Sequence, residues 1–303
     1  MSRFDVRQVR RAFSRAADGY DAGAALQRRI GQRLLETLDY LDDPGLGRAP
    51  PRRVLDIGSG TGHFSALLQR RWPQAQVVAI DLALPMLHRL QARDGGWRAR
   101  LTRAPRVQPL CADARALPLA DASFDLVFSN LCLQWLDDLP AVFAQWRRVL
   151  APDGALVAST FGPDTLWELR EAFAQADDAP HVSPFADIAR VGDALVAAGF
   201  RQPVLDRELD VEAHADLPAL MQGLRTLGAT NALQARRHAL TGRGRFRAAE
   251  AAYPRDAEGR LPATWESIAI LAYAPPAGAT VREGDVDVAA VPLSSIPIRR
   301  RGR

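Results

Sequence analysis

The residues best suited to chemistry stand in one short stretch, where an apolar run that contains an acidic residue is followed by alternate glycines. Residues 54–62 read Val-Leu-Asp-Ile-Gly-Ser-Gly-Thr-Gly, with Asp56 inside the run and Gly58, Gly60 and Gly62 after it. Such glycines let a buried strand turn sharply into a helix and leave bare backbone beside a ligand. Asp56 can orient this turn or accept a hydrogen bond from the ammonium group of a ligand. The G-x-G-x-G spacing differs from the G-x-G-x-x-G of dinucleotide sites.

Three further polar residues follow predicted strands. Asp81 ends an apolar run, and a carboxylate there can accept two hydrogen bonds from ribose hydroxyls. Asp113 can accept from an adenine amino group, and Ala114 behind it offers a backbone N–H. Asn130 can line a sulfonium pocket with its backbone and amide. Each residue could instead cap a helix or turn, and the glycine turn could serve packing alone, so their convergence at strand ends carries the argument.

Strands and helices alternate through the first half of the chain, which is typical of a parallel, doubly wound α/β sheet. Ligands of such sheets bind at the carboxyl ends of the strands, where the polar residues above are expected. The pattern predicts strands over 54–57, 76–80, 107–111, 124–129 and 155–160, and helices over 63–71, 85–93 and 139–150.

The flanks of this core have their own patterns. Residues 1–45 read as helices that cover the site, and 46–275 as the main domain. Two helices between the last two predicted strands would form a lid, about residues 212–255, over the carboxyl edge of the sheet. We expect the Arg-rich tail, 276–303, to be mostly disordered. The predicted elements after residue 160 are helices 165–176, 188–198, 217–227 and 233–252 and strands 203–211 and 267–273.

The composition is that of a globular enzyme or binding protein. The 303 residues are 48 % hydrophobic, and no apolar run approaches the roughly 20 residues that cross a bilayer. The N-terminus lacks the apolar stretch of a signal peptide, so we expect a cytoplasmic protein without a membrane partner. Cys111 and Cys132 lack metal-ligand spacing, so we expect buried, reduced thiols and no metal.

The net charge of +4 comes entirely from arginine, because the chain has no lysine. A basic balance favours acidic partners in general. The arginines are too scattered to indicate nucleic acid, for which a long basic stripe with stacked aromatics is typical. The densest run near the predicted lid would either meet an acidic partner or form a solvated helix face; it holds Arg236, Arg237, Arg243, Arg245 and Arg247.

Residues 53–161 resemble class I S-adenosylmethionine-dependent methyltransferases, which have a Rossmann-like sheet. The flanks resemble one family among them, the malonyl-acyl-carrier-protein O-methyltransferases of biotin synthesis. The segments that carry this resemblance are 12–21 (AFSRAADGYD), 129–135 (SNLCLQW), 181–185 (HVSPF) and 224–231 (LRTLGATN). The likeness runs from about residue 9 to 275, whereas the connection 94–106 is longer and more basic than is usual in the family.

The resemblance implies methyl transfer from S-adenosylmethionine to the free carboxylate of a malonyl thioester, with S-adenosylhomocysteine as product. The thioester would be carried by acyl carrier protein or by coenzyme A, and the methyl ester would start pimeloyl synthesis for biotin. The implied cofactor contacts are Asp56, Gly58, Gly60, Gly62, Asp81, Leu82, Asp113, Ala114 and Asn130.

The acceptor carboxylate is ionised at neutral pH, so the reaction needs positioning and exclusion of water rather than a strong base. Arg225, in the predicted lid, is the candidate for gripping this carboxylate with a guanidinium. Tyr20 would cover the methionine part of the cofactor or donate to the carboxylate, and His181 would donate to the substrate or seal the pocket. Each residue could instead have a purely structural role: Arg225 as a solvated arginine, Tyr20 as a packed tyrosine and His181 as a core histidine.

Three other functions stay open from the sequence alone. The acceptor could be another small acid or a quinone-type metabolite, since the lid decides acceptor choice. The chain could be a nucleotide-binding oxidoreductase, although the glycine spacing and the lack of a second dinucleotide half speak against it. It could also bind the cofactor without catalysis.

Overall fold

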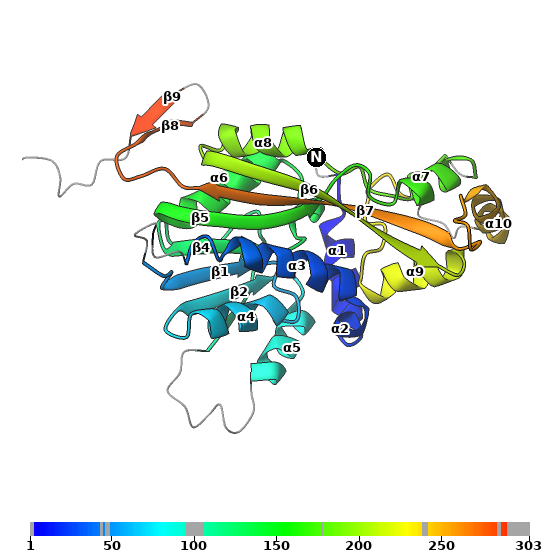
Figure 1. Ribbon diagram of the computed structural model, residues 1–303, viewed down its shortest axis with the longest axis horizontal. Coiled ribbons are helices and arrows are strands. Elements are labelled where there is room, and N and C mark those ends of the chain that lie inside the picture. Colours follow the sequence, from blue (N-terminus) through cyan, green and yellow to red (C-terminus); the bar gives the residue numbers. More distant parts are fainter. Residues whose placement is uncertain are drawn as a thin grey trace, which may run out of the picture.

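The structure, a computed structural model, describes residues 3–42, 45, 49–94, 106–176, 178–237, 242–283 and 286–289. The strands of its main sheet are β1 (Arg53–Ile57), β2 (Gln76–Asp81), β3 (Gln108–Cys111), β4 (Phe124–Ser129), β5 (Leu150–Phe161), β6 (Arg201–His214) and β7 (Leu261–Tyr273). They lie in the order β3-β2-β1-β4-β5-β7-β6 (Figure 1). The doubly wound α/β sheet expected from the sequence is confirmed.

The expectation of an all-parallel sheet is wrong at one strand. Neighbours from β3 to β5 are parallel, but β7 runs antiparallel to both β5 and β6. The reason is that the connection 215–260 begins at His214 and ends at Leu261, which pair with each other, so the chain returns along β6 in the opposite direction.

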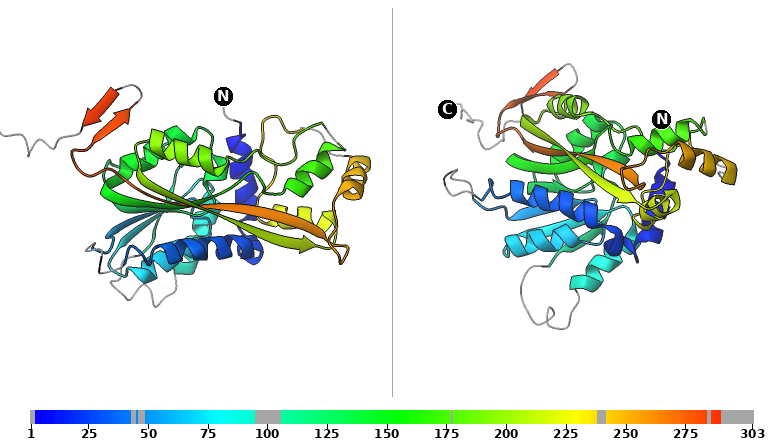
Figure 2. Two further views of the ribbon diagram at one scale, coloured as in Figure 1. Left: turned by 45° about the horizontal axis from the view of Figure 1, so that its top comes forward. Right: turned by 45° about the vertical axis from the view of Figure 1, so that its right-hand side comes forward.

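Helices cover both faces of the sheet and one of its ends. Helices α3, α4 and α5 pack on one face, and α6 and α8 on the other, as the two views of Figure 2 show. The face helices are α3 (Ala25–Thr37), α4 (His63–Arg71), α5 (Leu84–Asp94), α6 (Leu139–Val149) and α8 (Ile188–Ala197). The others are α1 (Val6–Ala16), α2 (Tyr20–Gly23), α7 (Trp167–Ala174), α9 (Leu217–Thr226), α10 (Arg243–Ala252) and the short 3-10 helix η3 (Leu133–Trp135).

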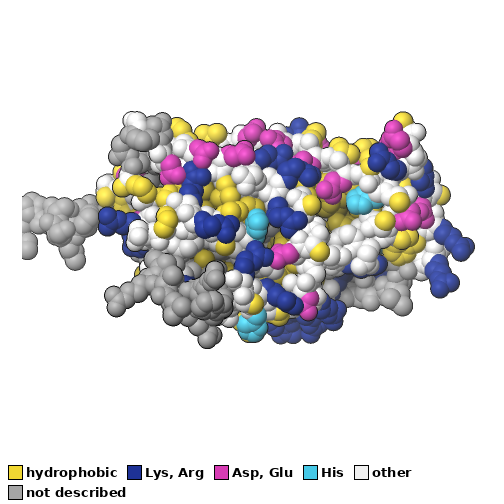
Figure 3. Space-filling view, turned by 60° about the horizontal axis from the view of Figure 1, so that its bottom comes forward, with side chains coloured by type: hydrophobic (Ala, Val, Ile, Leu, Met, Phe, Trp, Pro, Cys, Tyr) yellow, Lys and Arg dark blue, Asp and Glu magenta, His cyan; other side chains and the backbone are white. Residues whose placement is uncertain are grey.

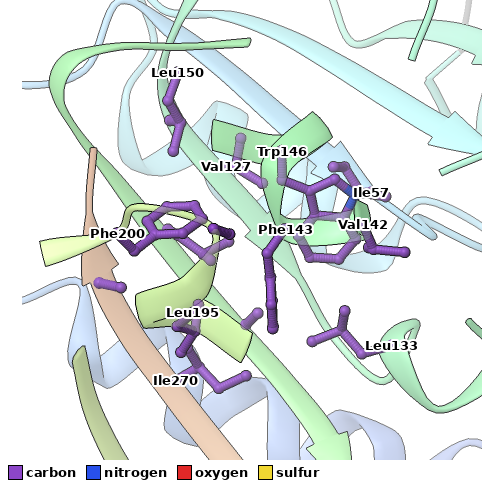
Figure 4. Packing of buried hydrophobic residues seen from close by; sticks show 14 of the residues in the cluster. Ile57, Val127, Leu133, Val142, Phe143, Trp146, Leu150, Leu195, Phe200 and Ile270 are labelled. Carbon is purple, nitrogen blue, oxygen red and sulfur yellow. The ribbon is translucent and has the colours of Figure 1, made fainter. Parts of the chain in front are cut away.

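The period-two alternation of side chains explains why β1 carries buried apolar residues on both faces. Val54 belongs to the core beneath α3 and α4, together with Leu34 and Leu68. Leu55, the next residue, faces the opposite core beneath α6, which holds Phe143 (Figure 4). Because both faces of the strand are buried, each aliphatic side chain contributes about 1.5–3 kcal/mol of hydrophobic stabilisation.

The paired strands β6 and β7 extend beyond the rest of the sheet, and the lid connects them. Only residues 267–273 of β7 pair with β5, whereas the pairing with β6 continues to His214 and Leu261. Helices α9 and α10 lie between these two strands in the chain and beside their free ends (Figure 1). Both strands are longer than predicted, because the sequence pattern does not distinguish a paired ribbon from a loop.

Two expectations differ from the structure outside the core. The predicted helix 233–252 is wrong in its first part, where Leu233 forms an isolated bridge with Phe4 and only α10 is helical. Gly242 immediately before α10 is a poor residue for a helix interior, and the apolar contact with Phe4 occupies Leu233 instead. In the tail, β8 (Thr280–Glu283) and β9 (Val286–Ala289) form a hairpin; residues 290–303 and 95–105 lie outside the described part.

Trp146 connects the main core to the ligand end of the sheet and provides a stability test. Its fully buried indole N–H donates to the carbonyl of Ala114 at 3.0 Å. We expect Trp146→Phe to lower the free energy of unfolding by about 2 kcal/mol, because volume is lost and a buried carbonyl is left unpaired. Denaturant unfolding measures this change.

Trp72→Phe is the matched control. The buried Trp72 also donates its indole N–H, to Asp42 at 2.9 Å, but it lies away from Ala114. Both variants should lose stability, whereas only Trp146→Phe should weaken binding of the expected product S-adenosylhomocysteine. Equal binding by both variants would contradict the link from Trp146 to the ligand end.

Candidate active site

The glycine turn after β1 is fixed to the end of β2 by backbone hydrogen bonds. Gly58 donates its N–H to the carbonyl of Ile80 at 2.8 Å, and Gly60 donates to Oδ2 of Asp81 at 2.9 Å. Gly58 has a φ of +72°, and a Cβ built on it would lie 2.6 Å from Cβ of Cys132. The loop after β4 therefore approaches so closely that only glycine fits at this position.

Two residues of the predicted turn have structural roles. Asp56 is only 2 % exposed, and Oγ of Ser65 donates to its Oδ2 at 2.5 Å, so this carboxyl joins β1 to α4. Burial raises the pKa of Asp56 to about 7. Gly62 lies at the start of α4, where an added Cβ would meet Cγ of Leu90 at 2.4 Å. This glycine permits close packing of α4 against α5.

The carboxylate of Asp81 is held at the end of β2 with hydrogen-bonding capacity to spare. Gly60 donates to Oδ2, and the N–H of Ala83 donates to Oδ1 at 2.7 Å. Each carboxylate oxygen accepts more than one hydrogen bond, so both can also serve a ligand. Burial raises the pKa of Asp81 to about 6, although these backbone donors act in the opposite direction.

Two adjoining cavities, here called the strand-end cavities, follow the carboxyl ends of the strands. The larger has about 780 Å³ of space and the smaller about 440 Å³. Both are lined by Tyr20, Gly58, Gly60 and Asn130, so they share a wall. The larger is also lined by Asp81, Leu82, Asp113 and Ala114, and the smaller by Asp56. Of the expected cofactor contacts, Gly62 alone lines neither of these two cavities.

Arg115, which the sequence analysis missed, holds one of the expected ligand groups. Its backbone N–H donates to Asp113 Oδ1 at 2.9 Å, and its Nη2 donates to Oδ2 at 2.6 Å. These bonds from Arg115 lower the pKa of Asp113, which therefore stays ionised. Arg115 itself lines the larger strand-end cavity. The alternation of acidic and basic residues after β3 is the only signal that could have indicated it.

The amide of Asn130 is occupied by protein partners. Its Nδ2 donates to the carbonyl of Gln27 at 2.9 Å, and its Oδ1 accepts from Oγ of Ser159 at 2.9 Å. The same Oγ accepts from the N–H of Leu131, which has a φ of +54°. Asn130 thus ties the end of β4 to α3 and β5, and it also lines both strand-end cavities.

The N-terminal helices close the strand-end cavities from outside. Phe13 on α1 lines the larger cavity, and Tyr20 on α2 lines both. Oγ1 of Thr61 in the glycine turn donates to Asp21 Oδ1 at 2.6 Å, and Arg93 on α5 forms an ion pair with the same carboxylate. Burial, followed by the charge of Asp81, raises the pKa of Tyr20. Asp21 and Thr61 were not among the expected site residues.

A third cavity, here called the lid cavity, lies between the lid and the ends of the central strands. It has about 920 Å³ of space, and Phe161, Phe185 and Trp265 supply aromatic walls. His181 and Arg225 both line it, whereas Tyr20 does not. Trp135 lines both the lid cavity and the larger strand-end cavity, so one indole separates the two spaces.

The polar groups of the lid cavity differ in how they are held. His181 stacks on Phe173 with ring centres 3.9 Å apart. Arg225 is exposed, and the described residues offer it no hydrogen bond or ion pair through its side chain. Three buried polar atoms also lack a hydrogen-bond partner among the described residues: Oε1 of Gln134, Oγ1 of Thr230 and Nε1 of Trp265. The sequence pattern did not single out these three.

The described residues contain neither a candidate metal site nor a helix that could span a membrane. Those residues contain no group of three or more His, Cys, Asp or Glu that could hold a metal ion. None of the described helices is long and apolar enough to cross a bilayer. Cys111 is exposed, against the expectation of burial, because it ends β3 at the edge of the sheet.

Comparison with known proteins finds similar chains and folds. Residues 55–158 match the family model described as a methyltransferase domain. The chain is 53 % identical over 300 residues to malonyl-acyl-carrier-protein O-methyltransferase of Xylella fastidiosa, with 98 % of each chain covered. It is 43 % identical over 265 residues to the Gallionella capsiferriformans protein of that name, covering 87 % of this chain and 89 % of the relative.

Among solved structures, phosphoethanolamine N-methyltransferase 2 of Haemonchus contortus aligns with a TM-score of 0.50 at 17 % identity. The alignment covers 91 % of this chain and 60 % of that one. At such low identity the likeness concerns the fold alone, and it agrees with the sheet described above.

The raised pKa of Asp81 predicts a pH dependence of cofactor binding. Ribose hydroxyls of the expected cofactor would donate to the ionised carboxylate, and burial raises the pKa of Asp81 to about 6, so protonation below that pH would remove this acceptor. We expect the affinity for S-adenosylhomocysteine to fall about tenfold per pH unit below that value. Titration calorimetry over a pH series measures it.

Asp81→Asn provides the control for this series. The variant should bind more weakly, and the fall in affinity attributed to the carboxyl should disappear. Burial, together with the charge of Asp81, raises the pKa of Asp56 to about 7, so in the variant any step from Asp56 should move to lower pH while the step from Asp81 disappears. The same pH profile in both proteins would show that Asp81 is not the titrating group.

Proposed function

Because the chain belongs to the malonyl-acyl-carrier-protein O-methyltransferase family, we propose that it methylates the free carboxylate of a malonyl thioester on an acyl carrier protein. The methyl donor is S-adenosylmethionine. The observation that carries the proposal is 53 % identity over 98 % of the chain to a relative of that name. A malonyl-coenzyme A acceptor, a place in biotin synthesis and a cytoplasmic location rest on the resemblance alone and stay predictions.

The walls of the strand-end cavities suit S-adenosylmethionine chemically. Asp81 would accept from the ribose hydroxyls, and Asp113 from the adenine amino group, with Leu82 as an apolar neighbour. The backbone at Gly58 and Gly60, beneath Tyr20, would lie beside the methionine part. Two carboxylates are compatible with a ligand that carries positive charge on its sulfur and its ammonium group.

The reaction needs little beyond positioning. When bound, S-adenosylmethionine supplies a methyl group on a positively charged sulfur. An oxygen of the acceptor carboxylate forms a bond to the methyl carbon while the carbon–sulfur bond breaks, and that electron pair stays on sulfur. The products are a methyl ester and S-adenosylhomocysteine. Because the carboxylate is already ionised near pH 7, no general base takes part.

The lid cavity is the proposed site of the malonyl group. Arg225 would grip the carboxylate, since its guanidinium has no ion pair among the described residues. His181, stacked on Phe173, would donate a hydrogen bond to the substrate or seal the cavity. The carboxylate would meet the methyl group at Trp135, where the lid cavity and the larger strand-end cavity share a wall. Tyr20 would act from the cofactor side.

The unpartnered polar atoms of the lid cavity support an acceptor with several hydrogen-bonding groups. A buried donor without a partner costs about 1–3 kcal/mol. The indole N–H of Trp265 and the hydroxyl of Thr230 are such groups, and a thioester carbonyl could accept from either. A malonyl thioester offers this carbonyl and, across one methylene group, a carboxylate, so it could satisfy both ends of the cavity.

A methyl-transfer assay tests the proposal. The protein, malonyl-acyl carrier protein and S-adenosylmethionine labelled in its methyl group should give labelled methyl ester on the carrier. Transfer only to other small acids or quinone-type compounds would replace the proposed acceptor. Binding of the cofactor without transfer to any of them would favour a binding protein without catalysis.

Arg225→Ala separates acceptor from cofactor binding. Loss of the charged grip should lower kcat/KM for the malonyl substrate by about 10- to 100-fold, while the affinity for S-adenosylhomocysteine stays within about twofold. Arg243→Ala, at an exposed arginine on the lid helix α10, is the control and should retain activity. Equal loss of substrate turnover and cofactor affinity in Arg225→Ala would contradict the assigned role.

A further inference from the structure

Helix α1 presents a basic outer face. Its eleven residues include Arg7, Arg10, Arg11 and Arg15 and no acidic residue. At about 100° per residue these arginines lie within an arc of about 140°, opposite the face that carries Val9 and the other buried residue, Ala16. All four are exposed. They are named here the α1 arginine stripe.

The α1 arginine stripe is unusual because its charges are not neutralised. Arg89 and Arg93 on α5 form ion pairs with Asp18 and Asp21, whereas no stripe arginine has a side-chain hydrogen bond or ion pair with another described residue. The nearby carboxylates are therefore occupied, and Asp5 at the start of α1 is paired with Arg236. Four uncompensated guanidinium groups repel one another at i, i+3 and i+4 spacing, which disfavours the helix unless an anion is near.

The arginine run near the lid, from Arg236 to Arg247, is a weaker candidate. Arg236 pairs with Asp5 at 3.0 Å, and Arg237 and Arg245 also have interactions within the protein. Figure 3 shows arginines mixed with acidic side chains across most of the face that it draws, and gathered densely at its lower edge. A segment rich in arginine is therefore not by itself a patch of unpaired positive charge, because arginines such as Arg236 are paired within the protein.

The stripe lies where a carrier would have to approach. The inner face of α1 lines the larger strand-end cavity through Val9 and Phe13. The segment after α9 packs on the same helix, since a Cβ at Gly228 would lie 3.2 Å from the carbonyl oxygen of Ala12. Arg225, which lines the lid cavity, is three residues before this contact. The stripe thus borders both the covered cofactor and the proposed acceptor site.

We propose that the α1 arginine stripe is the docking surface for an acidic face of the protein that carries the malonyl thioester. The proposal rests on the function proposed above. Guanidinium groups at fixed helical spacing match carboxylates on a partner surface, and they remain charged at every physiological pH. Such contacts at the rim of an interface mainly raise the rate of encounter and make it depend on salt. The thioester arm would then reach the lid cavity past α9.

The test compares two substrates in one charge-reversal variant. Arg7→Glu/Arg11→Glu should lower kcat/KM for malonyl-acyl carrier protein by more than about tenfold and weaken its salt dependence. Turnover of malonyl-N-acetylcysteamine, which has no protein to dock, should stay unchanged. The matched control is Arg52→Glu/Arg201→Glu, at exposed arginines next to the start of β1 and at the start of β6, the opposite end of the sheet. This control should keep full activity on both substrates.

Several outcomes would overturn the docking surface. They are equal loss in the stripe and control variants, equal loss on both substrates, or carrier binding that is unchanged in the stripe variant by titration calorimetry. Unchanged affinity for S-adenosylhomocysteine shows that α1 remains folded in the charge-reversal variant. If that affinity falls, Arg7→Gln/Arg11→Gln takes its place in the same comparison. Wild-type protein that methylates neither substrate refutes the proposed function instead, and the calorimetric comparison still decides the surface. Stripe-dependent binding to duplex DNA or anionic vesicles, without carrier binding, would also refute it.

Discussion

The hydrogen bond from the N–H of Gly60 to the carboxylate of Asp81 is the contact on which the site depends. It joins the turn after β1 to the end of β2 at 2.9 Å and fixes both the bare backbone and the acidic group of the candidate cofactor site. The geometry is possible only because Gly58 lets the loop after β4 approach within contact of the turn. The ends of β1, β2 and β4 are thereby held together at one edge of the sheet.

From this fixed edge the chain builds two compartments with different chemistry. The strand-end cavities combine carboxylates and backbone groups, which suits a cationic nucleoside donor. The lid cavity combines aromatic walls with a cation and unpartnered polar atoms, which suits an anionic acyl acceptor. Trp135 stands between them. With an acceptor that is already ionised, this separation and the exclusion of water are the catalytic work that remains.

The sequence predicted those strands, helices and strand-end residues whose local sequence pattern agrees with their position in the folded protein. Strand-end residues such as Asp81 and Asp113 follow from the alternation of strands and helices, because carboxyl ends of parallel strands meet at one edge. The side-chain pairs could not be predicted. The hydrogen bonds from Arg115 to Asp113 and from Thr61 to Asp21 depend on side-chain geometry. The reversal of β7 and the bridge of Leu233 to Phe4 could not be predicted either, since both arise from contacts between distant segments. Gly62, which the sequence analysis expected beside the cofactor, packs closely against Leu90, a contact that the sequence pattern did not indicate.

A crystal structure of the complex with S-adenosylhomocysteine would test the central claim most directly. The account predicts ribose hydroxyls on Asp81, adenine beside Asp113, and the sulfur directed toward Trp135 and the lid cavity. A sulfur that faces away from Trp135, with no open path to His181 and Arg225, would contradict it, because the two compartments would then not share one reaction.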